Sequence, residues 1–105
     1  MIRSLFAGAL VSGIVCGLPA HAQPTDPNLG RNLAAACANC HGTSGVSLPG
    51  MPALAGQQKD YLVQQMQEFK SGKRPATIMH QIARGYTDQQ IEALASYFAA
   101  QKGRP

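Results

Sequence analysis

Two cysteines and a histidine form the stretch of the chain that is best suited to carry chemistry. Cys37 and Cys40 are three residues apart, and His41 follows directly. On a helical turn, residues i and i+3 share a face, so both sulfurs can reach the two vinyl groups on one porphyrin edge. The adjoining imidazole can then bind the iron of that porphyrin. This spacing therefore predicts covalent attachment of one haem c.

The C-x-x-C spacing also occurs in dithiol redox pairs and in zinc sites. A thioredoxin-like pair needs a βαβ context, and a zinc site needs a second pair of ligands at finger-like spacing. No cysteine follows Cys40, and the only later histidine is His80. Both alternatives therefore lack the context that they need, and haem attachment is the interpretation that we favour.

An iron with one protein ligand has a second axial position to fill. A thioether ligand raises the reduction potential and is typical of electron-transfer haems, whereas a second imidazole lowers it. Met79 follows His41 at a distance that lets the chain pass around the ring, and we predict it as the sixth ligand. The alternatives are His80, Met51, Met66 or an open site, although a lone methionine on an apolar helix stripe usually fills the core.

The start of the chain has the pattern of a secretory signal peptide. Arg3 supplies a positive charge, an apolar run over 5–18 follows, and residues 20–22 form an A-x-A pattern. The apolar run is too short and too rich in glycine to predict a membrane span. We therefore expect residues 1–22 to be a cleaved signal peptide and residues 23–105 to be one domain in the periplasm.

A third cysteine lies within the expected signal peptide. Cys16 would be discarded on cleavage, because Val15 is larger than the residue that a lipoprotein site prefers before its cysteine. A lipid anchor on Cys16 is the alternative.

The net charge of +4 is mild, and the basic residues are scattered along the 105 residues. This distribution does not favour a nucleic-acid partner. No other apolar run is long enough to span a membrane. A domain this small usually needs a cross-link or a bound group to stabilise its fold, and a covalent haem provides one.

Hydrophobic periodicity predicts three helices, over residues 28–39, 57–71 and 87–101. Asn28 is the expected N-cap of the first helix, and Gly72 is the expected end of the second. Thr87 and Gln90 have the form of a capping box at the start of the third. No stretch alternates as a strand would, so we predict an all-α fold.

A loop rich in glycine and proline is predicted over residues 42–56. A metal-ligating imidazole donates its other N–H to a carbonyl or a carboxylate, which fixes the ring. A carbonyl from the rigid segment at Pro52 can serve His41 in this way. The alternative is that Pro52 only shapes a turn.

These motifs make the chain similar to class I c-type cytochromes, and to cytochrome c4-type domains in particular. The motifs are C-x-x-C-H-G at 37–42, P-x-L-x-G at 52–56 and T-D-x-x-I-x-x-L-A-x-Y-F at 87–98. The resemblance implies the class I cytochrome c fold, with about three to five helices wrapped around one haem. It also implies that Gly30 lets the first helix cross the last one near Tyr97.

The same resemblance implies a role for each site residue. Cys37 and Cys40 would hold the haem, and His41 and Met79 would be the axial ligands of its iron. The Pro52 carbonyl would orient His41. With both axial positions filled, no position remains for a substrate to bind the iron, so the chain would carry electrons and would not be an enzyme by itself.

The run M-x-x-I-A-R-G-Y-T-D from 79 to 88 is most similar to the haem subunit of flavocytochrome c sulfide dehydrogenase. In that family, a small exported cytochrome sits beside an FAD-containing flavoprotein that oxidises sulfide. The resemblance implies that electrons arrive from this flavoprotein and leave to a second soluble carrier. The alternatives are a free-standing shuttle to a terminal oxidase or reductase, and a haem-based catalyst or ligand sensor.

Overall fold

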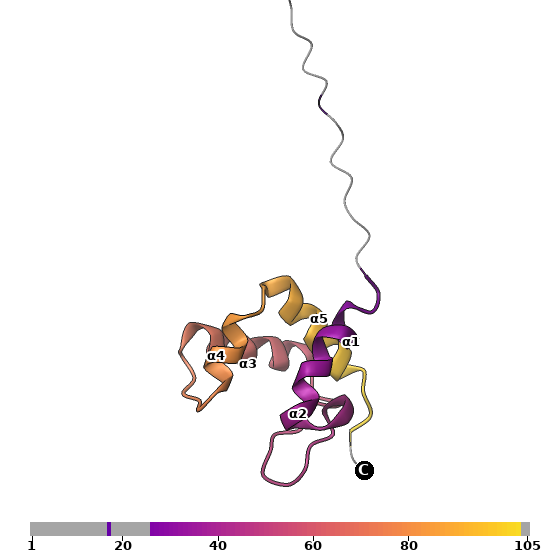
Figure 1. Cartoon of the computed structure of the whole chain (residues 1–105), viewed down its shortest axis with the longest axis vertical. Coiled ribbons are helices and arrows are strands. Elements are labelled where there is room, and N and C mark those ends of the chain that lie inside the picture. Colours follow the sequence, from indigo (N-terminus) through magenta and orange to yellow (C-terminus); the bar gives the residue numbers. More distant parts are fainter. Residues whose placement is uncertain (1–16, 18–25, 104–105) are drawn as a thin grey trace, which may run out of the picture.

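The computed structural model describes Gly17 and residues 26–103 (Figure 1). Apart from Gly17, the predicted signal peptide, with its cleavage site and Cys16, lies outside the described residues. Within the described part, the chain forms five α-helices and two short 3₁₀ turns and contains no strand. The prediction of an all-α fold is confirmed.

The first helical segment runs to the end of the Cys–His motif. It consists of α1 (Leu29–Ala34), the 3₁₀ turn η1 (Ala35–Cys37) and α2 (Ala38–His41). It ends two residues later than predicted, before Gly42, whose φ of 78° a residue with a side chain rarely adopts. The predicted N-cap position of Asn28 is confirmed, although its side chain makes no capping hydrogen bond.

A loop then leads to three further helices. The loop contains the 3₁₀ turn η2 (Thr43–Gly45) and is followed by α3 (Lys59–Ser71), α4 (Met79–Arg84) and α5 (Asp88–Ala99). The predicted end of α3 is confirmed, since Gly72 adopts the left-handed conformation with a φ of 80°. Helix α4 is not among the helices that periodicity predicted.

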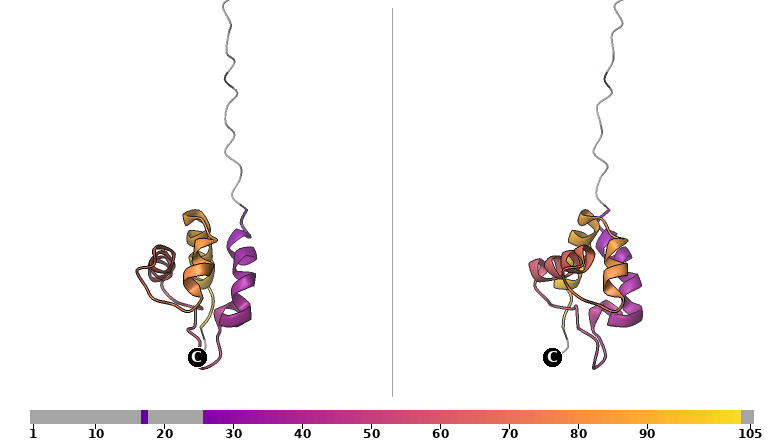
Figure 2. Two further views of the ribbon diagram at one scale, coloured as in Figure 1. Left: turned by 60° about the vertical axis from the view of Figure 1, so that its left-hand side comes forward. Right: turned by 90° about the vertical axis from the view of Figure 1, so that its left-hand side faces the viewer.

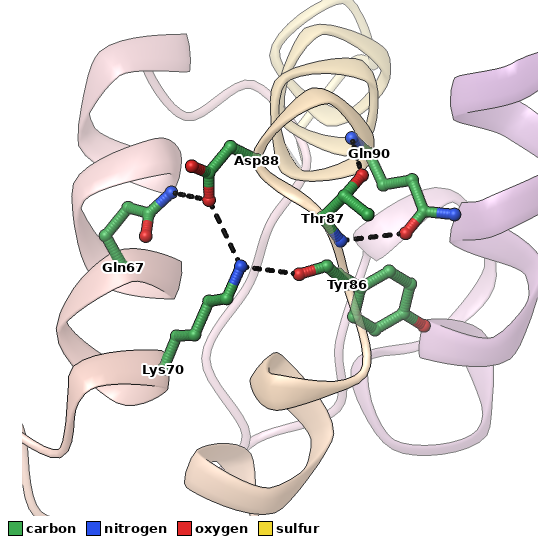
Figure 3. A network of polar contacts seen from close by, with 6 residues as sticks. All are labelled: Gln67, Lys70, Tyr86, Thr87, Asp88 and Gln90. Carbon is green, nitrogen blue, oxygen red and sulfur yellow. Dashed lines mark hydrogen bonds and ion pairs between the residues drawn. The ribbon is translucent and has the colours of Figure 1, made fainter.

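The N-terminus of α5 has the predicted capping box. The Gln90 backbone N–H donates to Thr87 Oγ1 at 3.2 Å, and the Thr87 backbone N–H donates to Gln90 Oε1 at 2.9 Å (Figure 3). Two of the free N–H groups at the helix start are satisfied in this way. The start of α5 is therefore well defined by two side chains three residues apart.

The core forms where α5 meets α1 and α3. Figures 1 and 2 show α1 running alongside α5, and α4 lies against α3. The main buried cluster consists of side chains from these elements, namely Ala34, Leu62, Leu94, Ala95 and Phe98. Among the described residues, no helix is both long and apolar enough to cross a bilayer.

The crossing of α1 and α5 depends on a glycine. A Cβ on Gly30 would lie 2.4 Å from the Ala93 carbonyl oxygen and 3.1 Å from Tyr97 Cβ. Both distances are shorter than van der Waals contact. The expectation that Gly30 lets the first helix approach the last near Tyr97 is confirmed.

Candidate functional site

The two cysteines lie on the first helical segment. Cys37 ends η1 and is half-buried against the core, whereas Cys40 lies in α2 and is exposed. No disulfide joins them. Burial raises the pKa of the Cys37 thiol, and the neighbouring Cys40 adds to this shift. The described residues contain no group of three metal-binding side chains, so the zinc alternative gains no further ligands there.

His41 is buried at the end of α2, and one of its ring nitrogens is already bound. Its Nδ1 lies 2.7 Å from the Pro52 carbonyl oxygen. A carbonyl oxygen can only accept, so Nδ1 carries the proton and donates it. The other nitrogen, Nε2, therefore keeps its lone pair, which is the state that a metal-ligating imidazole needs. The donor set thus fits a haem iron, and the predicted contact with Pro52 is present.

The loop that brings Pro52 to His41 is held by its own backbone. The N–H groups of Leu54 and Ala55 both donate to the Gly45 carbonyl, at 2.9 and 3.1 Å. Ser47 Oγ donates to the Met51 carbonyl at 2.6 Å, directly before Pro52. These bonds close the loop on itself, so the Pro52 carbonyl is presented from a constrained segment.

Met79 comes from a different part of the fold. It is the first residue of α4 and is half-buried. It shares a helix face with Ala83, four residues later, which is completely buried. In Figure 1, α4 lies apart from α2, to its left. The other methionines in the described residues lie elsewhere, with Met51 exposed on the loop and Met66 half-buried on α3.

His80 has an unusual environment. Its side chain is half-buried, and its Nδ1 is fully buried without a hydrogen-bond partner among the described residues.

Tyr86 is a residue near the site that the sequence analysis did not identify. It packs against the same core cluster as Cys37. Burial raises the pKa of the Tyr86 hydroxyl, and the nearby Cys37 adds to this shift. By contrast, Tyr61 is exposed, and Phe69 lies under the Arg74 guanidinium at 4.8 Å from the ring centre. Tyr86 follows α4 in a turn, where no periodic pattern identifies a contact.

A polar network fixes the turn that carries Tyr86 (Figure 3). Lys70 Nζ donates to the Tyr86 carbonyl at 2.8 Å and lies 3.1 Å from Asp88 Oδ1. Gln67 Nε2 donates to the same carboxylate oxygen at 2.9 Å. The hydrogen bonds from Gln67 and Lys70, together with the lysine charge, hold the pKa of Asp88 below its usual range.

The chain is similar to a known family and to several known proteins. Residues 28–102 match the family model described as cytochrome c. The chain is 37% identical over 76 residues to the cytochrome subunit of sulfide dehydrogenase from Chlorobaculum tepidum, covering 72% of this chain and 69% of that protein. It is 43% identical to cytochrome c4 from Pseudomonas aeruginosa, covering 96% of this chain and 50% of that protein.

A solved structure supports the same relationship. The reduced recombinant cytochrome c4 from Pseudomonas stutzeri superposes with a TM-score of 0.70 at 36% identity, covering 75% of this chain and 47% of that chain. The chain thus spans about half the length of its cytochrome c4 relatives.

Proposed function

Because the chain belongs to the cytochrome c family, we propose that it is the haem subunit that accepts electrons from the flavoprotein of a sulfide dehydrogenase. It is an electron carrier, and its cofactor is one haem c attached through Cys37 and Cys40. The observation that carries haem binding is the buried His41, whose Nδ1 donates to the Pro52 carbonyl and leaves Nε2 to bind the iron. The similarity to the Chlorobaculum tepidum subunit supports the choice of partner.

Each site residue has a task in this proposal. His41 and Met79 would hold the haem iron, and the Pro52 carbonyl keeps the His41 ring in one orientation. The haem would supply a reversible one-electron change between ferric and ferrous iron. With two ligands from the chain, the iron would offer no free site to sulfide or oxygen.

We also propose that residues 1–22 are removed on export and that residues 23–105 act in the periplasm. The positive start, the apolar run and the A-x-A pattern support this. A soluble acceptor would then take the electron onward.

A free-standing shuttle is the second candidate, because the identity to cytochrome c4 is higher and extends over 96% of this chain. The two candidates differ in whether the chain forms a stable complex with another protein. A subunit stays bound to a flavoprotein during purification, whereas a shuttle is isolated alone and meets its partners briefly.

Co-purification distinguishes these candidates. We expect that the tagged chain, purified gently from its native periplasm, brings a flavin with it, and that sulfide reduces its haem much faster than it reduces the recombinant cytochrome alone. The measurement is the absorption spectrum before and after sulfide is added. Haem without flavin, reduced no faster than the control, would instead support the shuttle.

The loop over residues 42–58 is the surface that we propose for the flavoprotein interface. This stretch contains no charged residue. Leu48 is 74% exposed and Met51 is 40% exposed, and both line a shallow apolar hollow on the loop. An uncharged surface with large exposed apolar side chains is typical of an interface core. The loop also carries Pro52, so a partner here lies close to the His41 side of the haem.

Placing a charge on this loop tests the proposed interface. We expect Leu48→Lys to weaken the complex about tenfold or more, because a desolvated charge replaces an apolar contact. The measurement is the amount of flavin that co-purifies, and the control is Tyr61→Lys, at a residue that is 48% exposed on α3. Equal losses in both variants would show that the loop has no special role.

A further inference from the structure

The contacts of Lys70 differ from those expected of a lysine near the end of a helix. Its charge is near the C-terminus of α3, where the helix dipole favours a cation. However, its Nζ reaches across to the turn between α4 and α5, where it meets the Tyr86 carbonyl and the Asp88 carboxylate (Figure 3). The side chain is 30% exposed, so much of its stem is covered.

The position of this cation has an electrostatic cost. The N-terminus of α5 begins at Asp88 and carries the positive end of its helix dipole, which repels Nζ. Asp88 offsets this repulsion, but its side chain is 79% exposed, and an ion pair this exposed contributes little. The hydrogen bond from Nζ to the part-buried Tyr86 carbonyl is charge-assisted and therefore stronger. The main effect of Lys70 is thus to hold this carbonyl.

The Tyr86 carbonyl is directly coupled to α4. The Gly85 N–H donates to the Ile82 carbonyl at 3.0 Å, and the Tyr86 N–H donates to the Ala83 carbonyl at 3.2 Å. Tyr86 therefore extends the last turn of α4. With six residues, α4 is too short to be stable by itself, so its position depends on tertiary contacts. One of these is the burial of Ala83, and another is the bond from Lys70.

We propose that Lys70 is a positioning residue for Met79, acting through Tyr86 and α4. The inference rests on the proposed assignment of Met79 as the sixth ligand. Lys70 ties α4 to the rigid helix α3, so that the thioether at the first position of α4 stays in place. Without the hydrogen bond from Lys70, the segment from 75 to 86 would move away from α3 more often. The Met79 thioether would then leave the iron for a larger fraction of the time, and an external ligand could bind there.

The test is an imidazole titration of the ferric holoprotein. Imidazole competes with Met79, so its apparent affinity reports the fraction of molecules in which the thioether has left. We expect Lys70→Met to raise this affinity about tenfold, the effect of losing one hydrogen bond from a charged group. Lys70→Arg, which keeps the charge and the donors, should recover most of the wild-type value. The near-infrared absorption band of thioether-ligated ferric haem gives a second readout.

The matched control is Lys59→Met. Lys59 also lies on α3, and its Nζ makes a 2.7 Å ion pair with Glu92 on α5, so the same charge and the same kind of interhelical bond are lost. We expect no change in imidazole affinity, because Lys59 lacks the bond to a backbone carbonyl that Lys70 makes at Tyr86, and its pair has no bond to the α4 segment. Equal changes in the two variants, or no change in Lys70→Met, would overturn the role of Lys70.

The wild-type spectrum distinguishes a failure of Met79 as the sixth ligand from a failure of Lys70 as its positioning residue. A ferric wild-type protein without the thioether band would overturn Met79 as the ligand, and the positioning role with it. A wild-type protein with the band, combined with an unchanged affinity in Lys70→Met, would overturn the role of Lys70 alone.

Discussion

The Met79→Ala protein is expected to lose the thioether band of the ferric haem and to have a lower reduction potential. A thioether stabilises the ferrous state relative to water or a nitrogen ligand. Each tenfold loss of that stabilisation lowers a one-electron potential by about 59 mV, and we expect at least this change. The open position should also bind carbon monoxide in the reduced protein without prior denaturation. Redox titration and absorption spectroscopy measure these effects.

The other methionines are the controls for this experiment. Met51→Ala and Met66→Ala should leave the band in place, because Met51 is exposed on the loop and Met66 lies on α3. Loss of the band in either of these variants, with the band of Met79→Ala unchanged, would identify that methionine as the ligand in place of Met79. If Met79→Ala retains a six-coordinate spectrum at lower potential, His80 is the replacement ligand to examine, since it is the next residue in the chain.

Gly30→Ala is expected to destabilise the protein by about 1–3 kcal/mol or more, the usual range for overpacking. The new Cβ would lie 2.4 Å from the Ala93 carbonyl oxygen, which is backbone and cannot rotate away. Helix α1 must therefore move away from α5. For a domain of this size, each kcal/mol corresponds to a change in Tm of about 4–8 °C. Thermal unfolding of the holoprotein, followed by circular dichroism, measures the loss.

Gly85→Ala is the control for this substitution. Gly85 has an ordinary φ of −76°, and the nearest atom to a new Cβ there is the Ile82 carbonyl oxygen at 3.3 Å. We expect a much smaller change in Tm, because neither the backbone conformation nor a helix crossing forbids the methyl group. A Tm for Gly30→Ala as high as that of Gly85→Ala would mean that α1 does not press on α5 in solution.

The features that the sequence predicted well depend on residues close together in the chain. The capping box at Thr87 and Gln90 and the left-handed Gly72 each lie within about one helical turn of the helix end that they define. The contact between His41 and Pro52 spans 11 residues. A ligating imidazole needs an acceptor, but the sequence pattern left a turn-only role for Pro52 open, and the resemblance to class I cytochromes implied the contact.

The sequence was less informative about which side chain makes a given bond and about short helices. Asn28 is the N-cap of α1 as expected, but its side chain makes no capping bond, and the Asp26 carboxylate accepts its backbone N–H at 2.8 Å. Helix α4 was not predicted, because six residues are too few to show a helical period. Its position depends on α3, which the local sequence of α4 does not encode.

By itself, the sequence determined the chemistry of this protein, namely the two cysteines, the histidine and the all-α framework that carries them. Only the tertiary structure decided that Tyr86 packs against the same core cluster as Cys37 and that Lys70, 16 residues before Tyr86, holds its carbonyl. A helix end or an attachment motif is a short-range property, because its partners are within a few residues. The position of α4 is a long-range property, because it follows from packing and hydrogen bonds between segments that meet only in the folded chain.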